Sequence, residues 1–151
     1  MKILIALDDS PVSARAAREA ARLFAGVGVE FLVISVSTLP MMWAGGPGYG
    51  MVTPMVMYPA LFEPSENAED DLVARAEAAG VADAEPHNES GDPVSVICRA
   101  AEAHNVDVIV VGSHDKSALR RLVDPSVAAG VVRETYRPVL VVSGEPPDSN
   151  G

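Results

Sequence analysis

Residues 2–11 read KILIALDDSP and begin the fold. The part at 2–7 is a short run, apolar after its first residue, which is typical of a strand buried on both faces of a parallel sheet. Two carboxylates stop this run. Ser10 and Pro11 then indicate a helix start, with Ser10 as the N-cap and Pro11 in the first helical position. A strand that leads directly into a helix is the repeating unit of an α/β domain.

The same alternation continues along the chain. We predict a helix to about residue 25, a strand at 30–36, a helix at 61–79, a polar strand at 81–88 near a sheet edge, a helix capped by Asp92, a strand at 106–111, a loop at 112–124, a helix at 126–135 and a strand at 138–143. This order predicts an open five-stranded parallel sheet with helices on both faces. If the first and fourth strands are neighbours, their following loops face each other across a ligand crevice.

Composition limits the function classes. A length of 151 residues suits one domain, and 48% hydrophobic with 21% charged residues is globular composition. The net charge of −10 argues against a nucleic-acid or anionic-membrane binder. The single cysteine, Cys98, excludes an internal disulfide framework and is expected to be a small core residue. With no signal-peptide pattern and no membrane-length apolar run, we expect a soluble, cytoplasmic protein.

The charge is distributed unevenly. Residues 63–92 hold ten acidic residues and one basic residue, whereas residues 112–143 hold five basic and three acidic residues. The positive stretch follows a predicted strand and enters a predicted helix, as an anion site would. Solvent-exposed helix faces of mixed sign are the alternative.

Residues 39–60 form an unusual segment with four prolines, four glycines and no charge. This composition excludes a long regular element. A surface loop is the simple interpretation. The other is an adaptable apolar contact surface for a partner or lid, anchored by Trp43 and Tyr49. We therefore expect one domain over 1–143 with this loop insertion, followed by a disordered tail at 144–151.

Four stretches together resemble the universal stress protein family. They are the opening strand that ends in Asp8, the turn Gly91-Asp92-Pro93, residues 107–114 (DVIVVGSH) and residues 138–142 (PVLVV). The resemblance runs from residue 2 to residue 143 apart from the 39–60 segment. It implies an adenine nucleotide alpha-hydrolase-like fold with strand order 3-2-1-4-5. It also implies a stress-response protein that acts by binding and regulation, without catalysis.

Many members of this family bind ATP through a loop written G-x2-G-x9-G-(S/T), in which glycines let the backbone approach the phosphates. On this sequence the first glycine is Gly112, but the second falls on Asp115 and the third on Pro125. A carboxylate about 4 Å from a phosphate costs on the order of 4 kcal/mol at an effective dielectric of 20. That is a loss of roughly a thousandfold in affinity unless Lys116, Arg120, Arg121 or Mg²⁺ compensates. No cofactor is therefore certain, and ATP stays a possible ligand.

The residues expected to contact a nucleoside match the family pattern better than those of the phosphate loop. By the same resemblance, Asp8 stands where the family's acidic residue meets the nucleoside, and Val36 stands where a residue of the second strand touches the base. Asp9 adds a negative charge where glycine is common. The candidate nucleotide-binding residues are Ala6, Asp8, Ser10, Val36, Gly112, His114, Asp115, Lys116, Ser126 and Val127.

Three functions stay open at this point. The first is a non-catalytic regulatory protein with a degenerate ATP loop, the second a functional ATP-binding member with nucleotide-gated partner binding, and the third a protein-interaction module without a small ligand. No P-loop or G-x-S-x-G elbow is present, so we expect no catalytic residues. A receiver-type signalling domain would need a lysine after the last strand, and none follows Pro138.

The histidines carry no metal-binding pattern in the sequence. None of the three is spaced from another as metal-ligating histidines usually are. We expect His87 on the surface and His104 at a helix end, where the helix dipole favours it. His114 lies in the family loop and is expected to line the pocket or to be structural.

The last strand suggests self-association. Val139, Leu140, Val141 and Val142 form an apolar run that would lie at a sheet edge. An exposed apolar edge pairs readily with another chain, and family members commonly dimerise through this strand. We expect a symmetric homodimer and an unidentified protein partner.

Overall fold

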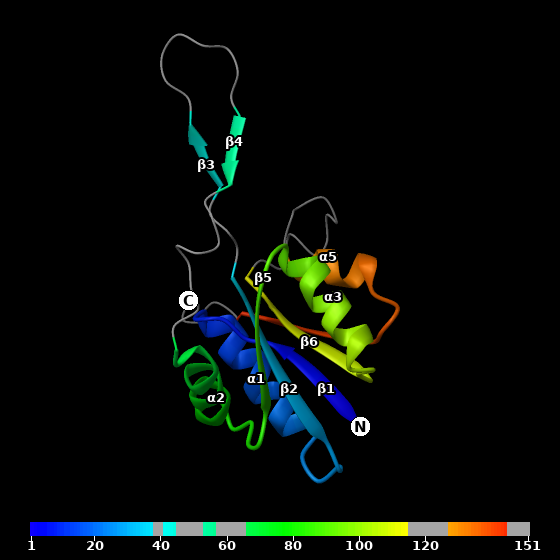
Figure 1. Cartoon of the computed structure of the whole chain (residues 1–151). Coiled ribbons are helices and arrows are strands. Elements are labelled where there is room, and N and C mark those ends of the chain that lie inside the picture. Colours follow the sequence, from blue (N-terminus) through cyan, green and yellow to red (C-terminus); the bar gives the residue numbers. More distant parts are fainter. Residues whose placement is uncertain (38–40, 45–52, 57–65, 115–126, 145–151) are drawn as a thin grey trace, which may run out of the picture.

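Strands and helices alternate along the computed structural model, which describes residues 1–37, 41–44, 53–56, 66–114 and 127–144 (Figure 1). The elements are β1 (Lys2–Ala6), α1 (Pro11–Leu23), β2 (Glu30–Ser37), β3 (Met41–Ala44), β4 (Thr53–Val56), α2 (Ala68–Ala78), β5 (Glu85–Ser90), α3 (Pro93–Ala103), β6 (Val108–Ser113), α5 (Val127–Glu134) and β7 (Val139–Ser143). Among the described helices, none is long and apolar enough to cross a membrane.

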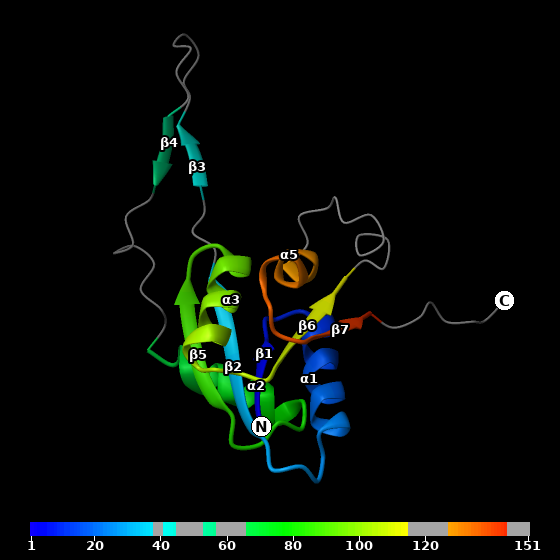
Figure 2. The same cartoon turned by 90° about the vertical axis from the view of Figure 1, so that its right-hand side faces the viewer.

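Five strands form one parallel sheet in the order β5-β2-β1-β6-β7. This is the predicted order 3-2-1-4-5, since β3 and β4 lie outside the sheet. The first and fourth sheet strands are neighbours, as the crevice argument required. The polar strand β5 lies at one edge of the sheet, as predicted, and the apolar strand β7 lies at the other (Figure 2).

Helices cover both faces of the sheet (Figure 2). On one face Ile3, Ile5 and Val33 pack against the buried residues of α1 and α2. On the other face Leu4 and Ile109 pack against α3 and α5. The alternation of Ile3, Leu4 and Ile5 between the two clusters follows the two-residue period of a strand. The core is aliphatic, as the low aromatic content predicted.

Two helix starts match the sequence prediction. Ser10 is the N-cap of α1, and its side chain accepts a hydrogen bond from the Ser13 N–H. Asp92 is the N-cap of α3 and accepts in the same way from Ser95. Each cap is followed by a proline, whose missing N–H costs nothing in the first helical turn.

Several predicted boundaries were wrong by a few residues. Helix α1 ends at Leu23 rather than near Ala25, and α2 begins at Ala68; residues 61–65 lie outside the described part. The strand predicted at 81–88 begins only at Glu85, because Gly80 (φ +88°) and Asp83 (φ +53°) hold the chain in a turn. The strand predicted at 106–111 is shifted to 108–113, since the Val106 N–H still bonds to Ala101 at the end of α3.

The 39–60 segment is not entirely loop. Strands β3 and β4 pair antiparallel within it, with Trp43 opposite Pro54. Both views show this hairpin standing away from the five-stranded sheet (Figures 1 and 2). A proline is tolerated there because a two-stranded ribbon has only edge strands. Composition did not reveal the two short strands in the described part of this segment, residues 41–44 and 53–56. Tyr49 and residues 145–151 of the predicted tail lie outside the described residues.

Candidate functional site

The crevice lies where the chain reverses its winding direction. After β1 the chain builds the β2–β5 half of the sheet, and after β6 it builds the β7 half. The carboxyl ends of β1 and β6 therefore meet at the switch point, which is where open α/β sheets bind ligands. Residues 7–10 leave β1 there, and residues 112–114 end β6.

Asp8 is held in one orientation by its own loop. Its Oδ1 accepts a hydrogen bond from the Ser10 N–H at 2.8 Å and another from the Ser10 hydroxyl. Burial raises the pKa of the Asp8 carboxyl, but hydrogen bonds from Ser10 and Ser13 and the nearby charge of His114 outweigh it, so the pKa lies below its usual value. Asp8 is therefore an ionised acceptor, fixed in place before any ligand arrives.

Ser13 ties this loop to the first turn of α1. It is only 5% exposed. Its Oγ is within hydrogen-bonding distance of the carbonyls of Asp8 (3.1 Å) and Ser10 (3.0 Å) and accepts from the Asp8 N–H at 3.2 Å. Ser13 was not among the site residues predicted from the sequence. A serine three residues after a serine N-cap was the available signal, since short hydroxyl side chains at such positions bond back to the local backbone.

Gly112 is required by packing. A Cβ at Gly112 would lie 2.9 Å from the Val12 carbonyl oxygen and 3.2 Å from the Ser13 nitrogen. Both atoms belong to the backbone of α1, so they cannot turn aside as a flexible side chain would. The first glycine of the family's loop pattern thus lets α1 approach β6 closely, whether or not a phosphate is bound.

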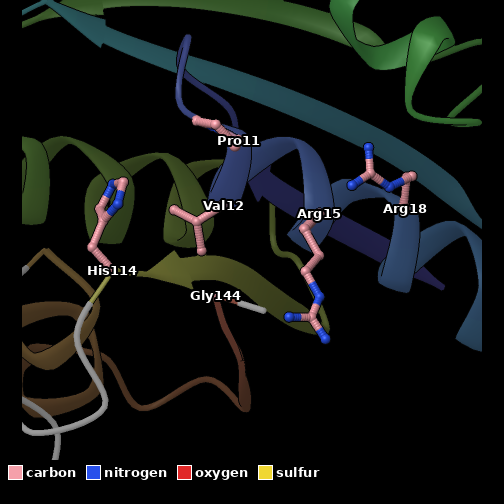
Figure 3. Close-up of a pocket in the computed structure, with 6 residues that line it drawn as sticks. All are labelled: Pro11, Val12, Arg15, Arg18, His114 and Gly144. Atoms are coloured by element: carbon pink, nitrogen blue, oxygen red, sulfur yellow. The ribbon is translucent and has the colours of Figure 1, made fainter. Parts of the chain in front are cut away.

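A cationic groove opens on the α1 side of this crevice. It has a volume of about 390 Å³ and is lined by Pro11, Val12, Arg15, Arg18, His114 and Gly144 (Figure 3). Arg15 extends toward β7 and donates from Nη1 to the Ser143 carbonyl at 3.0 Å. Arg18 makes no ion pair with any of the described residues. From the sequence, the candidate anion site was placed in 112–143, and neither arginine of α1 was among the predicted site residues.

The remaining predicted site residues fall into three groups. Ala6 and Val36 are half-buried on the opposite face, against the α3 and α5 cluster. Val127 is exposed at the start of α5. Asp115, Lys116 and Ser126 lie outside the described residues. The structure therefore brings together Asp8, Ser10, Gly112 and His114, while Ala6 and Val36 approach the same strand ends from the other face.

Asp9 and Cys98 are two further ionisable side chains. Asp9 is 97% exposed and pairs with Arg75 of α2 at 3.0 Å. The Cys98 thiol is half-buried, and burial together with Glu134, Glu102 and Asp92 raises its pKa. A raised pKa keeps a thiol protonated and unreactive, in keeping with Cys98 as a packing residue.

Comparisons with known proteins agree on one family. The model of the universal stress protein family matches residues 1–143. Universal stress protein MJ0531 of Methanocaldococcus jannaschii is 32% identical over 143 residues, covering 93% of this chain and 81% of that protein. Universal stress protein MJ0577 of the same organism is 40% identical over 52 residues, which is 34% of this chain and 32% of that protein.

Two solved structures share the fold. A universal stress protein in complex with cAMP has a TM-score of 0.65 and 24% identity, over 95% of this chain and 96% of that one. The universal stress protein from Archaeoglobus fulgidus in complex with dAMP has a TM-score of 0.59 and 24% identity, over 94% of this chain and 97% of that one.

Proposed function

The chain belongs to the universal stress protein family, and from that premise we propose that it is a non-catalytic regulatory protein whose nucleotide site is intact on the nucleoside side and degenerate on the phosphate side. The preferred ligand is an adenine nucleoside or nucleoside monophosphate, and ATP binds more weakly. The observation that carries this proposal is the Asp8 carboxylate, held ionised by Ser10 at the carboxyl end of β1. A fixed carboxylate there is suited to accept hydrogen bonds from sugar hydroxyls.

The phosphate side argues against a triphosphate. The positions of two loop glycines hold Asp115 and Pro125 in this sequence, and Asp124 adds a further carboxylate. Proline offers no N–H to a phosphate oxygen, and each carboxylate repels a polyphosphate. Arg15 and Arg18 bring positive charge to the α1 side of the crevice, and His114 lines the same groove, which suits one phosphate group. Both nucleotide-bound neighbours hold adenine ligands with a single phosphate, cAMP and dAMP.

Titration calorimetry on the nucleotide-stripped protein tests this proposal. Adenosine, AMP, cAMP and ATP are compared, the last with and without Mg²⁺. We expect the ligands with no phosphate or one phosphate to bind more tightly than ATP. The double variant Asp115→Gly, Pro125→Gly is expected to raise ATP affinity by up to roughly a thousandfold. Native protein that binds ATP as tightly as AMP would overturn the proposal, as would steady release of phosphate from ATP.

An Asp8→Ala variant supplies the matched control. It removes the acceptor on the nucleoside side and is expected to weaken adenosine and AMP alike. If it weakened only ATP, the assignment of Asp8 to the nucleoside would be wrong. We further place the protein in the cytoplasm, because a single cysteine suits a reducing compartment.

The β7 edge supports a homodimer as the working form. The Ile109 N–H donates to the Pro138 carbonyl, and Ile109 is in register with Val139. Alternate residues of a parallel strand bond to the same neighbour. Because the Pro138 carbonyl points to β6, Val139 and Val141 turn their backbone N–H and C=O groups to the open edge of the sheet. A second copy can pair with these groups across a two-fold axis.

The β3–β4 hairpin supports the alternative function, a protein-interaction module. Its backbone pairs within itself, and it stands away from the sheet (Figure 1). The segment around it is rich in methionine and carries no charge, which suits contact with a protein surface. If Trp43→Ala abolished partner binding while nucleotide had no effect on it, this alternative would be favoured.

A further inference from the structure

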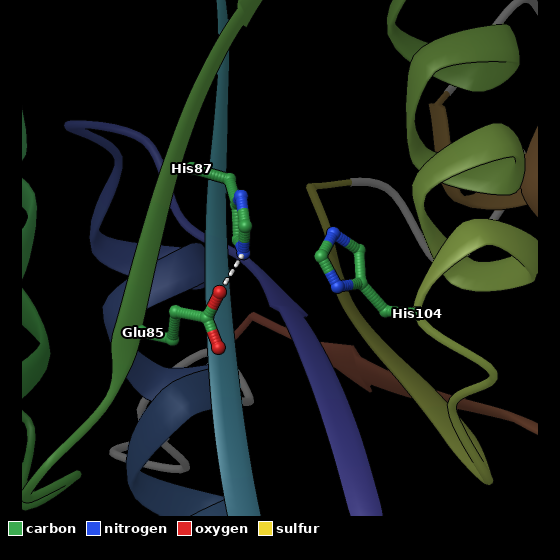
Figure 4. Close-up of side chains that lie close together, drawn as sticks. All are labelled: Glu85, His87 and His104. Atoms are coloured by element: carbon green, nitrogen blue, oxygen red, sulfur yellow. Dashed lines mark ion pairs between the residues drawn. The ribbon is translucent and has the colours of Figure 1, made fainter.

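A second cluster of chemically active side chains lies at the β5 edge of the sheet and shares no residue with the crevice. Glu85 and His87 are two residues apart on β5, so both side chains lie on the same face of the strand. His104 is the C-cap residue of α3, the helix that packs over this face. The fold therefore joins two histidines that are far apart in the chain (Figure 4).

The distances within this cluster fit a metal ion. His87 Nε2 lies 3.2 Å from Glu85 Oε1. The rings of His87 and His104 are 4.5 Å apart between centroids and tilted by 53°. One ligand atom from each of the three residues lies within 4.8 Å of the others. Ligands about 2.0 Å from a tetrahedral zinc are about 3.3 Å apart, so the Glu85–His87 pair already has the spacing of one tetrahedral edge.

One atom of this cluster lacks the partner that its burial demands. His87 Nε2 is buried and makes no hydrogen bond with any of the described residues. Glu85 Oε1 is near enough for an ion pair, but the two groups are not aligned as a donor and an acceptor. Buried ring nitrogens almost always have a partner. A cation bound between the His87 nitrogen and the Glu85 oxygen would supply the missing partner.

Access and ligand chemistry select the ion. The His87 side chain is 21% exposed and that of Glu85 is 65% exposed, so a path from solvent exists. Two imidazoles and one carboxylate suit Zn²⁺, whereas Mg²⁺ and Ca²⁺ prefer oxygen ligands alone. Three protein ligands leave a fourth position for water.

We propose that Glu85, His87 and His104 form a Zn²⁺ site that fastens the edge strand β5 to the end of α3. Neither histidine was expected to bind metal from the sequence. His104 is at a helix end as predicted, and His87 was predicted on the surface but is only 21% exposed. The alternative is a metal-free contact in which protonated His87 pairs with Glu85 and His104 stacks beside them.

Metal titration of the full chain separates these two possibilities. Chelator-treated protein is titrated with Zn²⁺ by calorimetry, and with Co²⁺ by visible absorption, where a tetrahedral site gives intense bands. We expect one equivalent to bind and the melting temperature to rise with Zn²⁺. His104→Gln should weaken binding more than the roughly 10–100-fold typical of changes outside the ligand shell.

The matched control is His114→Ala, which removes the described histidine outside the cluster and should leave the Zn²⁺ affinity unchanged. The melting temperature of His104→Gln without metal shows whether this variant still folds. Adenosine affinity should be the same with and without Zn²⁺. An absence of Zn²⁺ binding would therefore not count against the proposed function. Absence of Zn²⁺ binding to the native protein, or equal binding to His104→Gln, would overturn the proposal.

Discussion

Replacing Gly112 by alanine tests whether this glycine is a packing residue. The added Cβ would lie 2.9 Å from the Val12 carbonyl oxygen and 3.0 Å from its carbonyl carbon. Real Cβ atoms avoid such distances, and the first turn of α1 must shift to relieve them. Overpacking of this kind costs about 1–3 kcal/mol. Alanine recovers about 0.5–1 kcal/mol of backbone entropy relative to glycine in a strand. The net expectation is a loss of about 1–2 kcal/mol.

Urea unfolding measures this difference. The midpoint should fall with the slope unchanged, and the melting temperature should fall by about 2–8 °C for a chain of this size. Gly28→Ala is the matched control, because a Cβ there meets nothing within 4 Å. That variant should be neutral or up to about 1 kcal/mol more stable. If Gly112→Ala were as stable as the control and lost only nucleotide affinity, the packing argument would be wrong.

Three further predictions follow from the same structure. Gly130→Ala places a Cβ 2.5 Å from Val94 Cγ2. The overpacking costs about 1–3 kcal/mol and alanine returns about 1 kcal/mol of helix propensity in α5, so urea unfolding should show a net loss of up to about 2 kcal/mol. The double variant with Val94→Ala should recover part of this loss, and an undiminished loss would contradict the contact. The lowered pKa of Asp8 stabilises the folded protein above the unfolded pKa, and this stabilisation is lost as the pH falls through the folded pKa. The free energy of unfolding of Asp8→Asn should therefore differ from that of native protein more at about pH 7 than at about pH 3. A difference that does not change with pH would refute this. Native protein should have the mass of a dimer in light scattering. Val141→Pro removes an outward N–H of β7 and should be monomeric. A monomeric native protein would exclude dimerisation through this edge.

The sequence resolved the fold because its signals were local and agreed with one another. The apolar run at 2–7, the cap pair Ser10 and Pro11, and the cap Asp92 each specify a strand or a helix start through interactions within a few residues. Boundaries were less certain. Gly80 and Asp83 delay β5 through a turn with positive φ, and the hydrophobic pattern of 81–88 does not reveal that turn.

The candidate site was predicted only in part. Asp8, Ser10, Gly112 and His114 were found because they follow strand ends, and parallel strands gather their carboxyl ends at one edge. Arg15 and Arg18 were missed because their spacing is that of an exposed helix face. Only the position of α1 beside β7 turns that face toward the groove.

By itself the sequence determined the class of the fold, the family and the replacement of two pattern glycines by Asp115 and Pro125, since all three depend on residue type and short-range spacing. The tertiary structure alone decided which distant residues meet. Gly112 faces α1, Asp9 pairs with Arg75, and His87 lies beside His104. These contacts arise because the sheet order places β5 and β7 at opposite edges and lays a helix across each face, and that arrangement is set by burial of the whole core, which no short stretch encodes.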